Sequence, residues 1–207
     1  MFSLFKKNPC EAKGNASTIT SISKHLARHS YQNCVEDYTN WSQFDKNLLG
    51  VSLDSDQILE GTYYFWTFDL SLLYKCLLIN SKAYSDKNLQ IFVEPVFSAI
   101  YLQSKSLFIQ YVKEGSGSSY FRFSFPTDEA IIDRVQRLMT LPFMTDSGAN
   151  FDKNSSIGDT YSKYLEVVGF ETDIEMRGRI FSHMLKSVET VMPVYAGAFK
   201  MMRDSLT

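Results

Sequence analysis

The sequence lacks the residues that mark a disulfide-stabilised, secreted or zinc-binding protein. Its three cysteines, Cys10, Cys34 and Cys76, are odd in number and far apart. They form neither a disulfide framework nor a zinc knuckle, which is typical of a reducing compartment. The opening MFSLFKK is followed by polar residues instead of an apolar run, so no secretory signal is indicated. We therefore expect a cytoplasmic protein.

The usual catalytic templates are missing as well. The sequence has no phosphate-binding P-loop, no dinucleotide glycine fingerprint and no Gly-x-Ser-x-Gly elbow. The short glycine run in EGSGSS lacks a third glycine and a following helix start, which favours a linker. These absences favour a binding protein over an enzyme, and no cofactor is expected.

Charge is nearly balanced overall but unevenly distributed. A net charge of −2 over 207 residues is not that of a general nucleic-acid binder. Residues 127–175, however, hold ten acidic residues against four basic ones. An acidic segment of this kind is either an ordinary solvated surface or a docking face for a basic partner. The candidate partner-binding residues are Asp146, Asp152, Asp159 and Glu166.

The chain is organised around one apolar stretch, ILEGTYYFWTFDLSLLYKCLL, from Ile58 to Leu78. It is too long for a strand and too aromatic for a surface helix, which predicts a central helix covered on most sides. The stretch approaches the length of a membrane span, but Glu60, Asp69 and Lys75 interrupt it. A buried helix in a fold with no membrane partner is the better interpretation.

A narrow polar stripe runs along this predicted helix. Its members, at about 100° per residue, are Glu60, Tyr64, Thr67, Ser71 and Lys75. Tyr64 is the residue most expected to be exposed. Asp69 projects from the opposite, apolar side, where a carboxylate must find a partner or remain protonated. Asp56 is the expected N-terminal cap of the helix.

Other segments predict further helices. One begins after Asn15 or Ser17 and breaks near Ser30, and the others cover about 86–114, 127–141, 159–168 and 172–204. Pro95 predicts either a kink or a later start at Glu94. The alternating YFRFSF predicts at most a minor β segment near residues 120–125.

The fold class that follows is mainly α. We expect a single-domain bundle of about six helices around the central apolar helix. Residues 1–14 are expected to be a flexible basic leader, and residues 15–207 one helical domain with a flexible loop at 114–119.

Arg177 breaks the pattern of the last predicted helix as Asp69 breaks that of the central one. Both fall on apolar faces, so they invite a buried charge pair lining an internal cleft. The alternative is an Arg177 that reaches water and an Asp69 bonded to tyrosine or serine hydroxyls.

His25, His29 and Glu36 have the spacing of one helical face, which is a conceivable metal arrangement. Neighbouring Lys24 and Arg28 disfavour a cation, so no metal is expected and a polar rim is the preferred interpretation.

The sequence thus predicts a non-catalytic protein-binding module with no nucleic-acid or membrane partner. In its most specific form it is a bacterial immunity or antitoxin-like protein that neutralises a basic partner through residues 127–175. The alternative is a helical small-molecule-binding protein, or an enzyme, with an internal cleft near Asp69 and Arg177.

Overall fold

The computed structural model describes residues 20–32, 54–83, 87–115, 123–143, 153–168 and 174–204. Nearly all of these are helical and none forms a strand, which confirms the expected mainly α fold. A first helix covers residues 20–32. It is followed by α2 (Ser55–Ala83), α3 (Lys87–Gly115), α4 (Asp128–Thr140), α5 (Ser156–Val168) and α6 (Ile174–Asp204). The expected leader at 1–14 lies outside the described residues, as does the loop at 114–119 beyond residue 115.

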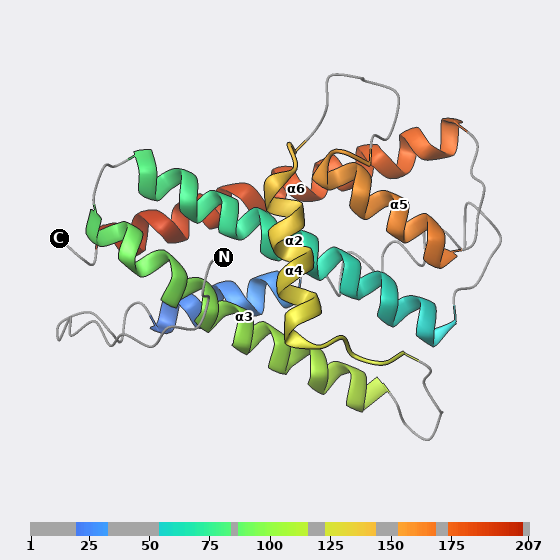
Figure 1. Ribbon diagram of the computed structural model, residues 1–207, viewed down its shortest axis with the longest axis horizontal. Helices are drawn as coiled ribbons and strands as arrows, with labels where there is room; N and C mark the ends of the chain where they lie inside the picture. Colours follow the sequence, from blue (N-terminus) through green and yellow to red (C-terminus); the bar gives the residue numbers. More distant parts are fainter. Residues whose placement is uncertain are drawn as a thin grey trace.

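The central helix of the fold is α2, as the sequence predicts. It packs against α3, α4, α5 and α6, and Figure 1 shows α4 laid across it. Trp66, Leu70 and Leu73 on α2 are no more than 1% exposed. The helix extends beyond the predicted Ile58–Leu78 at both ends. Its aromatic side chains are covered from several directions, so α2 is the scaffold that positions the rest.

A capping box fixes the start of α2. The backbone N–H of Gln57 donates to Asp54 Oδ1 at 2.8 Å, and the backbone N–H of Asp54 donates to Gln57 Oε1 at 3.0 Å. This reciprocal pair satisfies two backbone donors that the helix leaves open. The expectation that Asp56 caps the helix is therefore wrong. Asp56 instead accepts the backbone N–H of Phe123 at 2.9 Å.

The segment before α4 is extended but forms no strand. Residues 123–127 have no regular secondary structure, so the expected β segment is absent from 123–125, and residues 120–122 lie outside the described part. Phe125 packs its ring on Phe108 and Trp66, with centroid distances of 5.3 and 6.2 Å. These ring contacts, together with the hydrogen bond from the Phe123 backbone to Asp56, fix the segment without any pairing to a strand.

The boundaries of α4 follow from its sequence. Thr127 is the N-cap, with its hydroxyl accepting the backbone N–H of Ala130 at 3.3 Å, and the helix ends at Thr140, before Pro142. Ile131, Val135 and Leu138 form the buried face, as expected. A short amphipathic helix with a defined start is thereby fixed against α2.

Two other boundary expectations need correction. The first helix continues through Ser30 to residue 32. Helix α3 covers Lys87–Gly115, close to the predicted 86–114, which excludes only the alternative start at Glu94. Helix α5 begins at Ser156 instead of near Asp159. It begins early because Ser155 caps it: Ser155 Oγ accepts the backbone N–H of Gly158 at 3.0 Å.

Candidate functional site

The polar stripe of α2 lies under α4 and α5 and not in water. Thr67 and Ser71 are 0% exposed, and Tyr64 is only half-buried instead of fully exposed. Thr67 Oγ1 accepts a hydrogen bond from Arg134 Nε of α4 at 2.9 Å. The expected exposure of Tyr64 is therefore only partial, because two later helices cover the stripe and bring their own polar groups.

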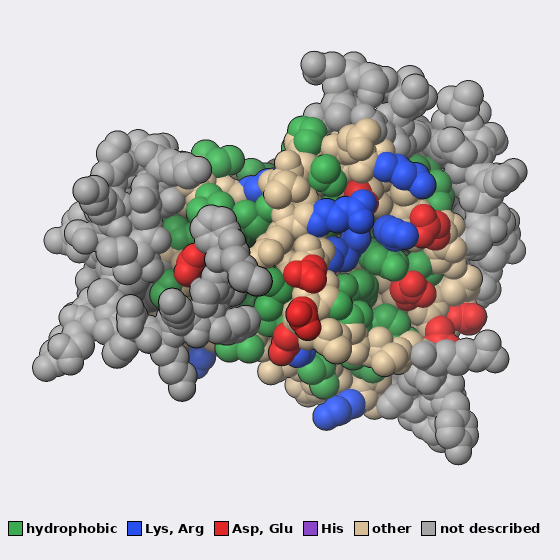
Figure 2. Space-filling model, in the orientation of Figure 1, with side chains coloured by type: hydrophobic (Ala, Val, Ile, Leu, Met, Phe, Trp, Pro, Cys, Tyr) green, Lys and Arg blue, Asp and Glu red, His purple; other side chains and the backbone are tan. Residues whose placement is uncertain are grey.

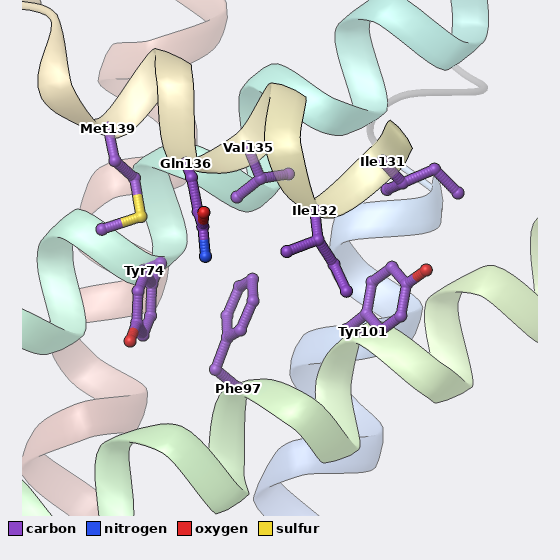
Figure 3. A pocket seen from close by; sticks show the side chains of 8 residues that line it. All are labelled: Tyr74, Phe97, Tyr101, Ile131, Ile132, Val135, Gln136 and Met139. Carbon is purple, nitrogen blue, oxygen red and sulfur yellow. The ribbon is translucent and has the colours of Figure 1, made fainter. Parts of the chain in front are cut away.

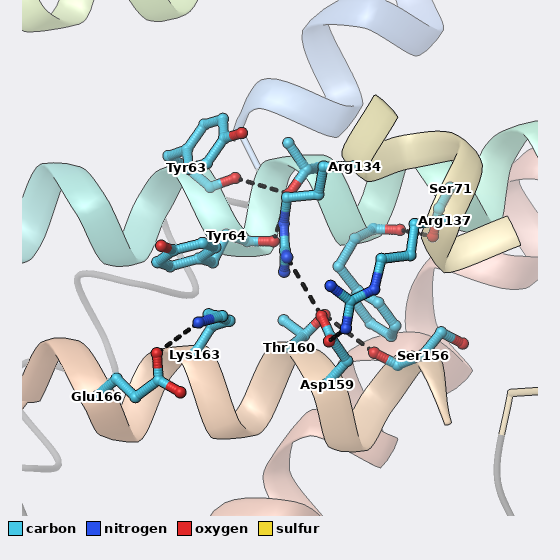
Figure 4. A network of polar contacts seen from close by, with 12 residues as sticks. Tyr63, Tyr64, Ser71, Arg134, Arg137, Ser156, Asp159, Thr160, Lys163 and Glu166 are labelled. Carbon is cyan, nitrogen blue, oxygen red and sulfur yellow. Dashed lines mark hydrogen bonds and ion pairs between the residues drawn. The ribbon is translucent and has the colours of Figure 1, made fainter. Parts of the chain in front are cut away.

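Asp159 of α5 is the centre of this buried polar cluster. Its carboxylate accepts a hydrogen bond from Arg134 Nη1 at 3.2 Å and one from Arg137 Nη2 at 2.7 Å (Figure 4). The side chains of Asp159, Arg134 and Arg137 are 4%, 11% and 61% exposed. One carboxylate is thus shared by two guanidinium groups, one internal and one open to solvent.

This geometry corrects the expected role of Asp159. A carboxylate that is almost fully buried and paired on both oxygens is not presented to a partner. Asp159 instead joins α5 to α4, because both arginines come from α4. Its charge belongs to the interior of the fold.

Arg134 is enclosed by aromatic and polar groups. Its guanidinium carbon lies 4.7 Å from the centre of the Tyr64 ring, a cation–π geometry. Burial lowers the pKa of Arg134, while the charge of Asp159 acts in the opposite direction. Burial also raises the pKa of the neighbouring Tyr63 and Tyr64 hydroxyls. The tyrosines therefore stay neutral and do not compensate the guanidinium charge.

Lys75 closes the other end of the stripe. Its ammonium group donates to the backbone carbonyl of Leu141 at 2.7 Å and to Ser156 Oγ at 3.4 Å. Burial lowers the pKa of Lys75. Neither of these acceptors is charged, so the lysine adds a further cation to the interface of α2, α4 and α5 without adding an anion.

Asp69 lies in a second, separate polar cluster. Tyr195 Oη of α6 donates to both carboxylate oxygens, at 2.6 and 2.5 Å, and Ser30 Oγ of the first helix donates to Oδ2. Asp69 is 6% exposed and Ser30 is 0% exposed. Asp69 thus has the hydroxyl partners of one of the two alternatives, and its pairing with Arg177 stays a prediction. The side chain of Arg177 lies outside the described part of the chain.

The two histidines of the possible metal arrangement lie on the first helix. The rings of His25 and His29 are 6.3 Å apart between centroids, and His29 lies 6.2 Å from the ring of Tyr195. Glu36 lies outside the described residues. Within those residues, no group of three or more histidine, cysteine or acidic side chains could hold a metal ion.

The remaining acids of 127–175 differ in their surroundings. Glu166 of α5 is exposed and pairs with Lys163 at 2.5 Å, one turn away. Glu129 and Asp133 of α4 are also exposed. Asp146 and Asp152 lie outside the described residues. Among the described residues of 127–175, the accessible acids are therefore on α4 and at the end of α5.

An apolar pocket lies between α2, α3 and α4 (Figure 3). It encloses about 270 Å³ of empty space, including the part open to solvent. The side chains that line it are Tyr74, Phe97, Tyr101, Ile131, Ile132, Val135, Gln136 and Met139. It is distinct from the expected cleft near Asp69 and holds no cluster of polar groups.

The two arginines of α4 were not among the residues singled out from the sequence. A signal for one of them is present, since Arg134 falls about 60° from Ile131 on a helical wheel, at the edge of the buried face. An arginine at that position needs a buried acceptor or must reach around to water.

Comparison with protein-family models, with curated proteins and with solved structures gave no match to this chain. Among the described helices, none combines the length and the apolar character that crossing a bilayer requires.

Proposed function

We propose that this protein is a non-catalytic binding module that takes a basic protein partner on the acidic half of α4. The observation that carries the proposal is the pair Glu129 and Asp133. Both are exposed, they lie one helical turn apart, and neither has an ion-pair partner among the described residues. Two unpaired like charges on one face are unfavourable within a helix unless something outside compensates them.

The acids of α4 are held in place before any partner arrives. Ile131, Val135 and Leu138 anchor the opposite face of the helix at 0–3% exposure. Asp128, next to Glu129, accepts hydrogen bonds from Lys105 and Tyr101 of α3. A charged surface that is already rigid loses little conformational entropy on binding, which favours association.

Acidic side chains are also present beyond α4. Figure 2 shows acidic side chains along one half of α4 and further ones over the neighbouring part of the same face, with lysine and arginine side chains between the two groups. Glu166 is among the exposed acids of the described chain, whereas Asp159 is not. Asp146 and Asp152 remain in the proposal because they belong to the segment that joins α4 to α5 in the sequence.

A narrower form of the proposal makes the partner a basic toxin and this chain its immunity or antitoxin protein in a bacterial cytoplasm. Charge complementarity supports this form of the proposal. An acidic surface speeds association with a basic partner and repels acidic proteins.

The test is affinity capture from a lysate of the native host, with elution by a salt gradient. Wild type is compared with the double variant Glu129→Lys/Asp133→Lys and with Glu189→Lys, a reversal at an exposed position of α6. We expect wild type and Glu189→Lys to retain the same basic protein and release it at moderate salt. Equal retention by the double variant would overturn the proposal.

A further inference from the structure

The interface between α4 and α5 carries more positive than negative charge. Arg134 and Arg137 share the single carboxylate of Asp159, and both remain protonated because a guanidinium does not lose its proton in proteins. Lys75, half-buried at the same interface, has only the uncharged acceptors described above. Three cationic side chains therefore lie at this interface with a single carboxylate between them.

Arg134 also has an unused donor. Its Nε donates to Thr67 and its Nη1 to Asp159, but the buried Nη2 has no hydrogen-bond partner among the described residues. A buried guanidinium N–H without an acceptor lowers the stability of the fold. Such a group indicates a place where an acceptor would bind favourably. Electrostatically, the interior of the cluster favours an anion close to Arg134.

The outer side of the cluster is open to that anion. Arg137 uses Nη2 for Asp159 but is 61% exposed. Lys163 lies one turn beyond Asp159 on α5, and Figure 4 shows the guanidinium of Arg134 between the side chains of Lys163 and Arg137. The pair that Lys163 makes with Glu166 is exposed, so it contributes little and is easily exchanged.

We propose that Arg137 and Lys163 bind a phosphate group of a small-molecule ligand above Asp159, with Arg134 beneath supplying compensating positive charge. Arginine forms paired hydrogen bonds with phosphate oxygens, and lysine acts as a point charge beside them. Phosphate carries up to two charges and more acceptor oxygens than a carboxylate, which suits three neighbouring cations.

The start of α5 does not provide this site. The backbone N–H groups of Ser156, Ile157 and Asp159 donate to backbone carbonyls, and that of Gly158 donates to Ser155 Oγ. The helix end is thus already satisfied, and the phosphate site rests on side chains alone. It borders the acids proposed to bind the protein partner, since Arg137 lies one helical turn after Asp133 and Lys163 pairs with Glu166.

The experiment titrates inorganic phosphate into the full chain at constant ionic strength, replacing sodium chloride, and follows heat release and melting temperature. Wild type and Lys200→Gln, which removes one exposed charge from α6, are expected to bind phosphate and melt later. Arg137→Gln and Lys163→Gln are each expected to weaken the affinity, the former by about tenfold.

A second variant and a second anion complete the experiment. Lys163→Gln leaves the pairing of Asp159 intact, so its phosphate affinity tests the proposal if Arg137→Gln fails to fold. Acetate at the same concentration is expected to stabilise less than phosphate. The proposal is overturned if phosphate acts no more strongly than chloride, if acetate matches it, or if Arg137→Gln responds like Lys200→Gln.

Discussion

Arg134 of α4 reaches the carboxylate of Asp159 on α5, with Nη1 3.2 Å from Oδ2, while its Nε donates to Thr67 of α2. A single side chain thereby connects three helices. It does so at the place where α2 presents hydroxyl groups instead of apolar ones. The packing of α4 and α5 on the central helix depends on this contact as well as on the apolar core.

Replacing Asp159 by asparagine is expected to destabilise the protein by about 3 kcal/mol. The change keeps the shape of the side chain but leaves the buried Arg134 guanidinium without its counter-charge. The measurement is the free energy of unfolding in urea at neutral pH. Glu166→Gln is the matched control, because that acid is 54% exposed and its loss should cost less than about 1 kcal/mol. Equal losses would show that the Asp159 pairs contribute no more than a surface pair.

Removing the hydroxyl of Tyr195 should lower the stability of the protein more than removing that of Tyr111. Replacement by phenylalanine tests both, because it keeps the ring. Tyr195→Phe deletes hydrogen bonds to the buried carboxylate of Asp69 and is expected to cost about 1.5–3 kcal/mol. Tyr111→Phe keeps a ring that packs on Tyr31 at 6.4 Å, and is expected to stay within about 0.5 kcal/mol of wild type. Chemical unfolding of both variants checks this. A neutral Tyr195→Phe would mean that Asp69 relies on other groups.

Parts of the fold are readable from the sequence because local chemistry determines them. The Thr127 cap, the acids after it and Pro142 fix α4 within a residue or two. The length and aromatic content of Ile58–Leu78 identify the central helix, because no single face of it could hide so many rings. Asp69 is also identifiable as an anomaly, since its position on an apolar face demands a partner.

The sequence does not show that other helices cover the polar stripe of α2. Thr67 and Ser71 belong to the polar stripe of α2, but their hydroxyls donate to the carbonyls of Tyr63 and Phe68 within their own helix, at 3.1 and 2.7 Å. Hydroxyls satisfied in this way can be buried under another helix at little cost. The burial of Asp159 likewise depends on arginines more than twenty positions earlier in the chain, and periodicity carries no information about such a pairing.

Gly197 is a site where the protein can be stabilised. It lies within α6, is exposed, and a Cβ atom built there would meet no heavy atom within 4 Å. Gly197→Ala is therefore expected to raise stability by about 0.5–1 kcal/mol, because alanine loses less backbone entropy in a helix. The neighbouring Ala196→Gly should lower it by a similar amount. Thermal melting of both variants is the measurement, and a destabilised Gly197→Ala would indicate that another part of the protein approaches this position.

Lys75 should give the protein a stability component that increases with pH. Burial lowers the pKa of Lys75 below the usual lysine value of 10.5, so in the pH range just below 10.5 the unfolded chain binds more protons at this residue than the folded one. Stability from this residue therefore rises as pH rises through that range. Lys75→Met removes the titrating group but keeps an unbranched side chain.

The test is the difference in unfolding free energy between wild type and Lys75→Met, measured at several pH values from 8 to 10.5. Taking the difference cancels the contribution of the buried tyrosines Tyr63 and Tyr64, which are present in both proteins. Their raised pKa values make stability fall as pH rises above 10, which is opposite to the effect of Lys75. The wild type should gain on the variant as pH increases. A difference that stays constant would mean that the Lys75 ammonium is as well solvated in the folded protein as in the unfolded chain. The carbonyl of Leu141 and the hydroxyl of Ser156 would then be incidental neighbours of a solvated lysine.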